Sequence, residues 1–175
     1  NGYKVYWSNG SQIIPPRDSG IAKAISAIQA INTWDPEVVD KHENVERIFS
    51  QANKEYLGSL RELVWPMPSV EMVMPFTYTP MHGVGLPFLR QIAHDMWFRG
   101  NNMRVVKAQA DPDPEFSTVP FPNPEEKGAL TLAFEEAQQN GTTIVIANDP
   151  DADRFSFAER IEKDKWHPYT GNQIG

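Results

Sequence analysis

Three carboxylates stand at alternate positions in the segment NDPDADR, residues 148–154. They are Asp149, Asp151 and Asp153, and they follow a continuous apolar, β-branched run over residues 142–147. Negative charges this close repel one another, and the repulsion is stronger in a partly buried setting. A hard divalent cation relieves it, because Mg²⁺ and Ca²⁺ take oxygen ligands. We therefore predict a cation site at this loop, with Arg154 placed to hold a phosphate oxygen beside the metal.

Other chemistries fit this loop less well, and an exposed acidic turn without a ligand is the alternative that stays open. An EF-hand counted from Asp149 requires Gly and Glu where the sequence has Arg154 and Arg160. A haloacid-dehalogenase-type phosphatase requires a long downstream domain with a lysine and further acids, which these 175 residues do not contain. A zinc site is disfavoured because cysteine is absent and the four histidines lack zinc-binding spacing.

Alternating helices and strands are expected to position the acidic loop. The expected elements are a strand over 70–78, a helix over 86–99, a strand over 103–108, a helix over 125–139, a strand over 142–147 and a strand or hairpin over 155–169. This order predicts an α/β fold, a three-layer-like βαβαβ mixed sheet with flanking helices. Ligand sites in such sheets lie beyond the carboxyl ends of the strands, where the loops 79–85 and 148–154 follow.

The residues before this alternation form a less regular pattern. A strand is expected over 3–7, a helix over 20–31 and a more polar helical region over 36–63. Pro66 and Pro68 end that region. We therefore place a boundary there, between residues 1–64 and an α/β domain over 65–168.

The loop MHGVG, residues 81–85, contains glycines after a predicted strand and before a predicted helix. A dinucleotide-binding fingerprint needs a third glycine where Phe88 stands, so a Rossmann cofactor site is disfavoured. The glycines instead indicate a tight turn or close packing. For His82, a hydrogen bond that stabilises the turn and a role facing a ligand both stay open.

Composition excludes several partners. The net charge is −7, from 16 Lys and Arg against 23 Asp and Glu, which disfavours nucleic acid binding. No apolar run approaches the ~20 residues of a membrane span, and the first residues lack a signal-peptide layout. The absence of cysteine excludes disulfides and a thiol nucleophile. We expect a cytoplasmic location, no membrane partner and no nucleic acid partner; the oligomeric state is left open.

Four stretches spread over the chain resemble the α-D-phosphohexomutase superfamily, in its phosphoglucomutase and phosphopentomutase branch. They are NGYKVYWSNGSQI, DPDPEF-TV-FPNPEEKGAL, ANDPDADR and TGNQIG. The resemblance implies that the chain is an internal fragment of a four-domain enzyme. Residues 1–64 would hold the end of domain one and linker helices, 65–168 domain two, and 169–175 the start of domain three.

The resemblance also implies a function, a phosphosugar mutase that acts on a hexose or pentose 1-phosphate. A phosphoserine gives its phosphoryl group to a sugar hydroxyl, and the resulting bisphosphate returns its other phosphoryl group to the serine. Such transfer depends on charge neutralisation and in-line placement. The alternative function is a non-catalytic α/β module that binds a cation or another ligand.

Residue roles follow from the same resemblance. Asp149, Asp151 and Asp153 match the Mg²⁺ ligands, and Arg154 matches the arginine that contacts the phosphoryl group. Lys4 matches the lysine proposed as a general acid and base. The phosphoserine motif of type T-A-S-H-N-P is absent from these residues. We therefore expect the fragment to be inactive alone.

Overall fold

The computed structural model describes residues 4–30, 35–63, 74–96 and 102–175. The chain divides into two compact units, Asn1–Ser50 and Gln51–Gly175, which are described separately. The boundary expected between residues 64 and 65 lies outside the described residues. No helix in the described ranges is both long and apolar enough to cross a membrane.

The described residues of the first unit form a short turn and two helices, and a third helix begins at the end of this unit. Of the strand expected over 3–7, the described part forms only an isolated antiparallel bridge between Tyr6 and Gln12, around a turn at Gly10. Helix α1 (Arg17–Ser26) begins and ends earlier than the predicted helix over 20–31. The helical region expected over 36–63 is divided into α2 (Glu37–Lys41) and α3 (Phe49–Leu63).

The described residues of the second unit build a five-stranded mixed sheet of order β2-β1-β3-β4-β5. The strands are β1 (Phe76–Thr79), β2 (Met103–Val105), β3 (Ile144–Asn148), β4 (Phe155–Glu162) and β5 (Lys165–Pro168). Strand β1 pairs in parallel with β2 and β3, whereas β3–β4 and β4–β5 are antiparallel. The predicted mixed α/β sheet is therefore confirmed, and of the strand or hairpin expected over 155–169 the hairpin is the one that forms.

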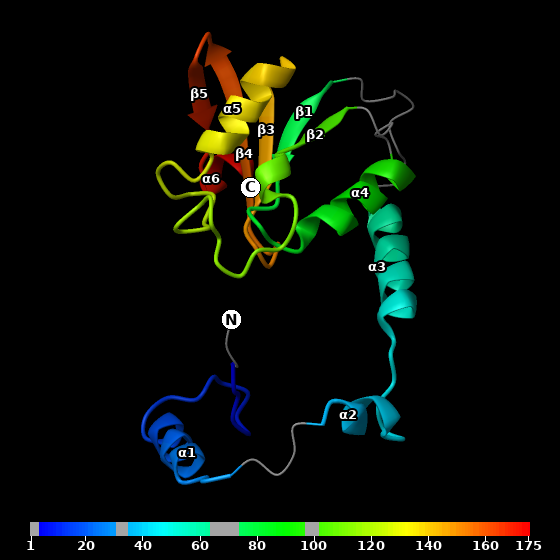
Figure 1. Cartoon of the computed structure of the whole chain (residues 1–175), viewed down its shortest axis with the longest axis vertical. Coiled ribbons are helices and arrows are strands. Elements are labelled where there is room, and N and C mark those ends of the chain that lie inside the picture. The colour runs from blue at the N-terminus through cyan, green and yellow to red at the C-terminus, as the bar shows by residue number, and fades with distance from the viewer. Residues whose placement is uncertain (1–3, 31–34, 64–73, 97–101) are drawn as a thin grey trace. The chain divides into compact units, whose positions relative to one another are not determined.

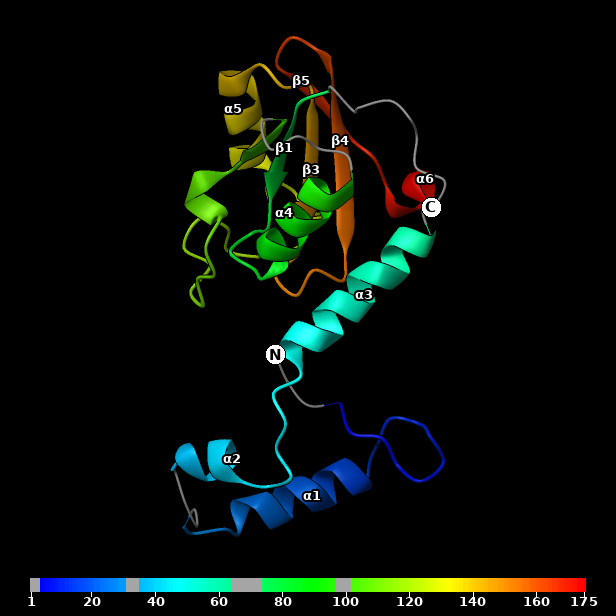
Figure 2. The same cartoon turned by 90° about the vertical axis from the view of Figure 1, so that its right-hand side faces the viewer.

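Helices cover both faces of this sheet (Figures 1 and 2). Helix α5 (Thr131–Asn140) contributes Ala133 and Ala137 to a core cluster that also contains Val145 of β3. Helix α4 (Gly85–Met96) contributes Leu86 to a second cluster, against which Ile144 of β3 packs. Because neighbouring strand residues point to opposite faces, β3 faces α5 with one set of residues and α4 with the other. The three-layer arrangement is confirmed.

Three boundaries differ from those predicted. Helix α5 starts at Thr131 rather than 125, because Gly128 adopts a left-handed φ of 86° that a continuous helix does not contain. Strand β1 starts directly after Pro75, which has no N–H for a sheet hydrogen bond. Strand β2 ends at Val105, and a 3₁₀ turn over Lys107–Gln109 follows. A short helix, α6 (Gly171–Ile174), begins with a capping box at Thr170.

Candidate metal site

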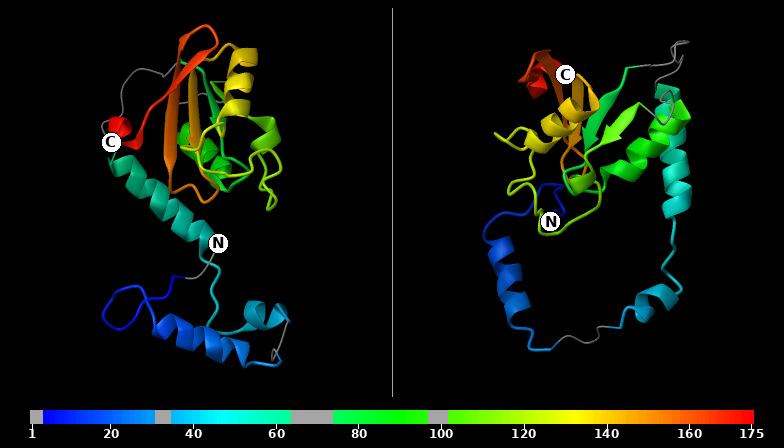
Figure 3. Two further views of the ribbon diagram at one scale, coloured as in Figure 1. Left: turned by 90° about the vertical axis from the view of Figure 1, so that its left-hand side faces the viewer. Right: turned by 45° about the horizontal axis from the view of Figure 1, so that its top comes forward.

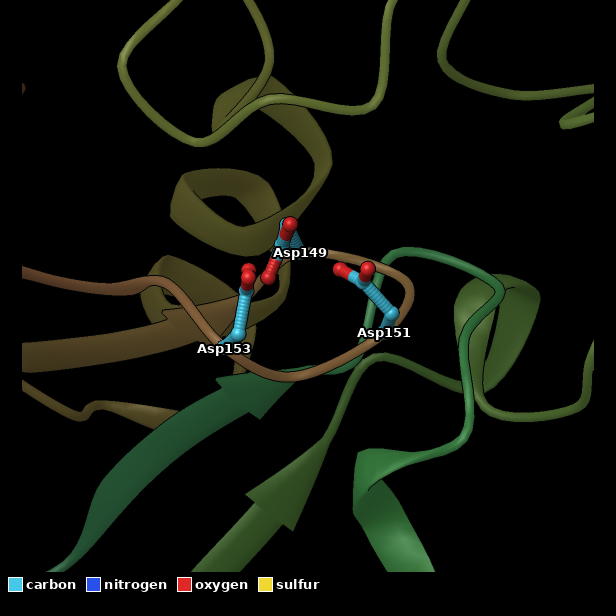
Figure 4. A group of neighbouring side chains, drawn as sticks. All are labelled: Asp149, Asp151 and Asp153. Atoms are coloured by element: carbon cyan, nitrogen blue, oxygen red, sulfur yellow. The ribbon is translucent and has the colours of Figure 1, made fainter. Parts of the chain in front are cut away.

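The connection from β3 to β4 carries the three carboxylates, and we call residues 149–154 the acidic loop. It leaves the carboxyl end of β3, the position that the sequence predicted. One carboxylate oxygen from each of Asp149, Asp151 and Asp153 lies within 4.8 Å of the others. Figure 4 shows the three side chains turned toward a common point. Asp149 is fully buried, whereas Asp151 and Asp153 are exposed.

Arg154 compensates the buried charge of Asp149. Its Nε and Nη2 atoms lie 2.8 and 2.7 Å from Oδ2 of Asp149, and its backbone N–H donates to Oδ1 at 3.0 Å. Burial acts to raise the pKa of Asp149, but the Arg154 N–H, Asp151 and the guanidinium outweigh it and lower that pKa. Asp149 is therefore held as a carboxylate. The guanidinium, about half exposed, also lies 3.7 Å from Asp153.

Asp151 has the opposite environment. A hydrogen bond with Asp149 and the charges of Asp149 and Asp153 raise the pKa of Asp151. The cluster therefore concentrates negative charge that its own residues neutralise only in part. Oxygen donors, mutual repulsion and one exposed side together fit a hard divalent cation such as Mg²⁺. These residues fit the ion that the sequence predicted, although its identity stays a prediction.

Asn148 fixes the base of the acidic loop, a role that the sequence did not indicate. Its side-chain amide donates to the carbonyl of Arg154 at 2.7 Å and accepts from the hydroxyl of Tyr78 at 3.1 Å. Tyr78 is fully buried in β1, and this burial raises the pKa of its hydroxyl to about 12. The hydroxyl thus stays a hydrogen-bond donor. The one feature of the sequence that pointed to this role is the position of the Asn148 amide directly before Asp149.

The loop between β1 and α4, residues 80–84, lies beside the acidic loop at the same end of the sheet (Figures 1 and 3). We call it the β1–α4 turn. His82 is buried there, and its Nε2 lies 2.7 Å from the hydroxyl of Thr118. Its backbone N–H donates to the carbonyl of Gln109 at 3.0 Å. Of the two roles left open for His82, these contacts support stabilisation of the turn. The prediction of close glycine packing is also confirmed, at Gly83.

Lys4, the fifth predicted site residue, lies in the first unit and is exposed. The other four residues come together in the second unit. The catalytic role of Lys4 stays a prediction, because it depends on the resemblance alone.

The fold and the site define a class, an α/β domain with a cluster of three carboxylates directly after the carboxyl end of β3. Residues 54–161 match the family model described as phosphoglucomutase/phosphomannomutase, alpha/beta/alpha domain II. The chain therefore belongs to the phosphoglucomutase/phosphomannomutase family. This match confirms the superfamily that the motifs indicated.

Similar proteins include mutases of pentose phosphates. The whole chain is 48% identical to a probable phosphoribomutase of Schizosaccharomyces pombe, and it spans 30% of that protein. It is 39% identical to the phosphopentomutase of Homo sapiens over 100% of this chain and 29% of that protein. Identity to the human glucose 1,6-bisphosphate synthase is 35%, over 99% of this chain and 28% of that protein. The chain thus spans less than a third of these relatives, and no solved structure matches it.

Proposed function

We propose that this chain supplies the metal-binding domain of a phosphosugar mutase. The enzyme would move a phosphoryl group between C1 and the terminal carbon of a sugar phosphate, through a phosphoserine and a bisphosphate intermediate. The observation that carries the proposal is the cluster of Asp149, Asp151 and Asp153, with oxygens within 4.8 Å, in a chain that belongs to this family.

Each residue of the site has a role in this proposal. The three aspartates would hold Mg²⁺, which when bound neutralises charge on the transferring phosphoryl group. Arg154 is half exposed and lies beside the cluster, so its guanidinium would orient a phosphoryl oxygen. Lys4 would take the proton of the attacking sugar hydroxyl and pass it to the serine oxygen that leaves. In the second transfer it would take the proton of the attacking serine hydroxyl and give it to the sugar oxygen that leaves.

The nucleophile is not assigned within these residues. Ser8, Ser11 and Ser19 lie in no motif of the phosphoserine type. The 175 residues would therefore not turn over by themselves. A coupled assay that detected mutase turnover at a normal rate with this chain alone would contradict that expectation.

A pentose phosphate is the substrate class that we propose first. The relatives named phosphoribomutase and phosphopentomutase are 48% and 39% identical, against 35% for the glucose 1,6-bisphosphate synthase. The reaction would interconvert ribose 1-phosphate and ribose 5-phosphate. Comparing kcat/KM for ribose 1-phosphate and glucose 1-phosphate tests this choice, and a clear preference for glucose 1-phosphate would overturn it.

The metal assignment is tested by Asp151→Asn in the intact enzyme that contains these residues. Because a metal ligand is lost, we expect kcat/KM to fall by at least about 100-fold. Even the loss of a residue that only hydrogen-bonds to a metal ligand typically lowers metal affinity or activity by about 10- to 100-fold. Asp111→Asn is the matched control, because Asp111 is exposed and outside the acidic loop. Unchanged Mg²⁺-dependent activity in Asp151→Asn would contradict the assignment. Cation binding without any turnover by the intact protein would favour the non-catalytic module.

A further inference from the structure

The β1–α4 turn and the acidic loop approach so closely at one point that only glycine fits. A Cβ atom added at Gly83 would lie 2.2 Å from Cα of Pro150 and 2.3 Å from its carbonyl oxygen. Both are backbone atoms, which cannot move aside as the end of a side chain can. Any side chain at this position must therefore displace the acidic loop, between Asp149 and Asp151.

A hydrogen bond joins the same segments, since the backbone N–H of Val84 donates to the carbonyl of Pro150 at 2.9 Å. Space is also tight at Gly85, the first residue of α4, where an added Cβ would lie 2.7 Å from the hydroxyl of Tyr78 and 3.3 Å from Cβ of Ala152. The β1–α4 turn thus contacts the acidic loop at its second residue, Pro150, which stands between Asp149 and Asp151.

The β1–α4 turn is itself held in an unusual conformation. Met81 and His82 both adopt left-handed φ angles, 48° and 60°, which side-chain-bearing residues rarely do. Both are buried, so the surrounding fold determines this conformation. The N–H of Met81 donates to the hydroxyl of Thr79 at 3.0 Å, and His82 bonds to Gln109 and Thr118. The turn therefore offers a fixed surface to a loop whose outer residues are exposed.

We propose that the β1–α4 turn sets the conformation of the acidic loop, and with it the spacing of the three carboxylates. Gly83, by allowing close contact, and the N–H of Val84, by bonding to Pro150, are positioning groups rather than metal ligands. The consequence for metal affinity rests on the proposed function, but the conformational claim does not.

Amide hydrogen exchange in the metal-free protein tests the conformational claim directly. The probes are the amides of Ala152 and Arg154, which donate to the carbonyl and to Oδ1 of Asp149. With Gly83→Ala we expect both to exchange at least about tenfold faster, because the loop opens locally, while the amide of Val145 in β3 is unchanged. The matched control is Gly58→Ala, since a Cβ at Gly58 meets nothing within 4 Å. Unchanged exchange of Ala152 and Arg154 in folded Gly83→Ala overturns the proposal.

A second pair of variants decides the question if Gly83→Ala does not fold. Val84→Pro removes the N–H that bonds to Pro150, and because Val84 precedes the first residue of α4, no hydrogen bond within that helix is lost. Val84→Ala keeps that N–H, and the Val84 side chain is 50% exposed. We expect loop amides to exchange about two- to tenfold faster in Val84→Pro than in Val84→Ala, the effect of one hydrogen bond. Equal exchange in the two variants overturns the proposal.

Mn²⁺ binding, measured by electron paramagnetic resonance, separates this proposal from the proposed function. We expect Gly83→Ala to weaken Mn²⁺ binding about tenfold or more while Gly58→Ala leaves it unchanged. If the unsubstituted protein does not bind Mn²⁺, the metal assignment is wrong, and the exchange data still decide the role of the turn. If it binds Mn²⁺ and Gly83→Ala binds equally well, the link between turn and carboxylate spacing is overturned.

Discussion

Arg154 holds both carboxylate oxygens of Asp149, Oδ2 through its guanidinium at 2.7 and 2.8 Å and Oδ1 through its backbone N–H at 3.0 Å. Asp149 has no exposed surface, so its charge would be costly without these donors. The pairing makes Arg154 a structural residue of the acidic loop, in addition to its proposed contact with a phosphoryl oxygen.

Arg154→Ala should therefore destabilise the protein. We expect the free energy of unfolding at pH 7 to fall by about 1–3 kcal/mol, because a buried carboxylate loses charge-assisted hydrogen bonds. Arg154→Lys should restore part of the loss, since lysine cannot match the fork of arginine. Urea unfolding measures both, with the exposed Arg104→Ala as a control expected within about 0.5 kcal/mol of the unsubstituted protein.

The same pair predicts a pH dependence. The pKa of Asp149 is lowered in the folded state, so its contribution to stability is present above its unfolded pKa of about 4 and is lost as the pH falls. The difference between Arg154→Ala and the unsubstituted protein should shrink from pH 7 toward low pH. A difference that stays constant over that range would contradict this account of the pair.

Asp151→Asn should stabilise the metal-free protein and abolish stabilisation by metal. The pKa of Asp151 is raised by its hydrogen bond with Asp149 and by the neighbouring charges, so ionised Asp151 opposes folding at neutral pH. Its favourable contribution is present below its unfolded pKa and is lost as the pH rises through the folded pKa. We therefore expect a higher Tm than that of the unsubstituted protein at pH 7 in EDTA.

With added Mn²⁺ the unsubstituted protein should have a higher Tm than Asp151→Asn, because an ion that binds only the folded state stabilises it by mass action. Thermal unfolding with EDTA and with Mn²⁺ measures both effects, with Asp111→Asn as the control that should follow the unsubstituted protein. A similar Mn²⁺-induced rise in Tm for Asp151→Asn would show that this carboxylate is not a ligand.

Asp113 should titrate far below an ordinary aspartate. Hydrogen bonds from the side chain and backbone of Ser117, and from the backbone N–H of Glu115, lower the pKa of Asp113 to about 2. Its carboxylate thus stabilises the folded loop above pH about 4, and this contribution is lost as the pH falls toward 2. Asp113→Asn should unfold with a flatter pH dependence between those values. An NMR titration of the Asp113 carboxyl group that gave an ordinary pKa near 4 would contradict the prediction.

The parts of this protein that the sequence predicted are those with a local signal. The run over 142–147 is apolar and β-branched, and it forms most of β3 with the aspartates directly after it. The predicted start of α5, residue 125, was wrong because the left-handed φ of Gly128 depends on the fold around it. Gly83 and Pro150 are far apart in the chain. The sequence therefore predicted that a glycine in the turn allows close packing, but not that Pro150 is the residue it packs against. No local sequence pattern predicts the side-chain hydrogen bonds of Asn148 and Gln109.

A buried pair of threonines connects the strands that carry the β1–α4 turn and the acidic loop. The hydroxyls of Thr77 in β1 and Thr142, just before β3, lie 2.7 Å apart, and both residues are fully buried. Replacing one threonine with valine removes a hydrogen-bond partner from the other hydroxyl, which should lower the free energy of unfolding by about 1–3 kcal/mol. Replacing both removes that second penalty, so the double variant should lose less stability than the sum of the single variants.

A double-mutant cycle of Thr77→Val and Thr142→Val, followed by urea unfolding, measures this coupling, which we expect to exceed about 0.5 kcal/mol. Thr143→Val is the control, because Thr143 is exposed beside the pair. Since Thr142 also lies 3.5 Å from the carbonyl of Ala137, its single variant should lose at least as much stability as Thr77→Val. Strictly additive losses would mean that the two hydroxyls do not depend on each other, and that these side chains add only packing to the backbone pairing of β1 with β3.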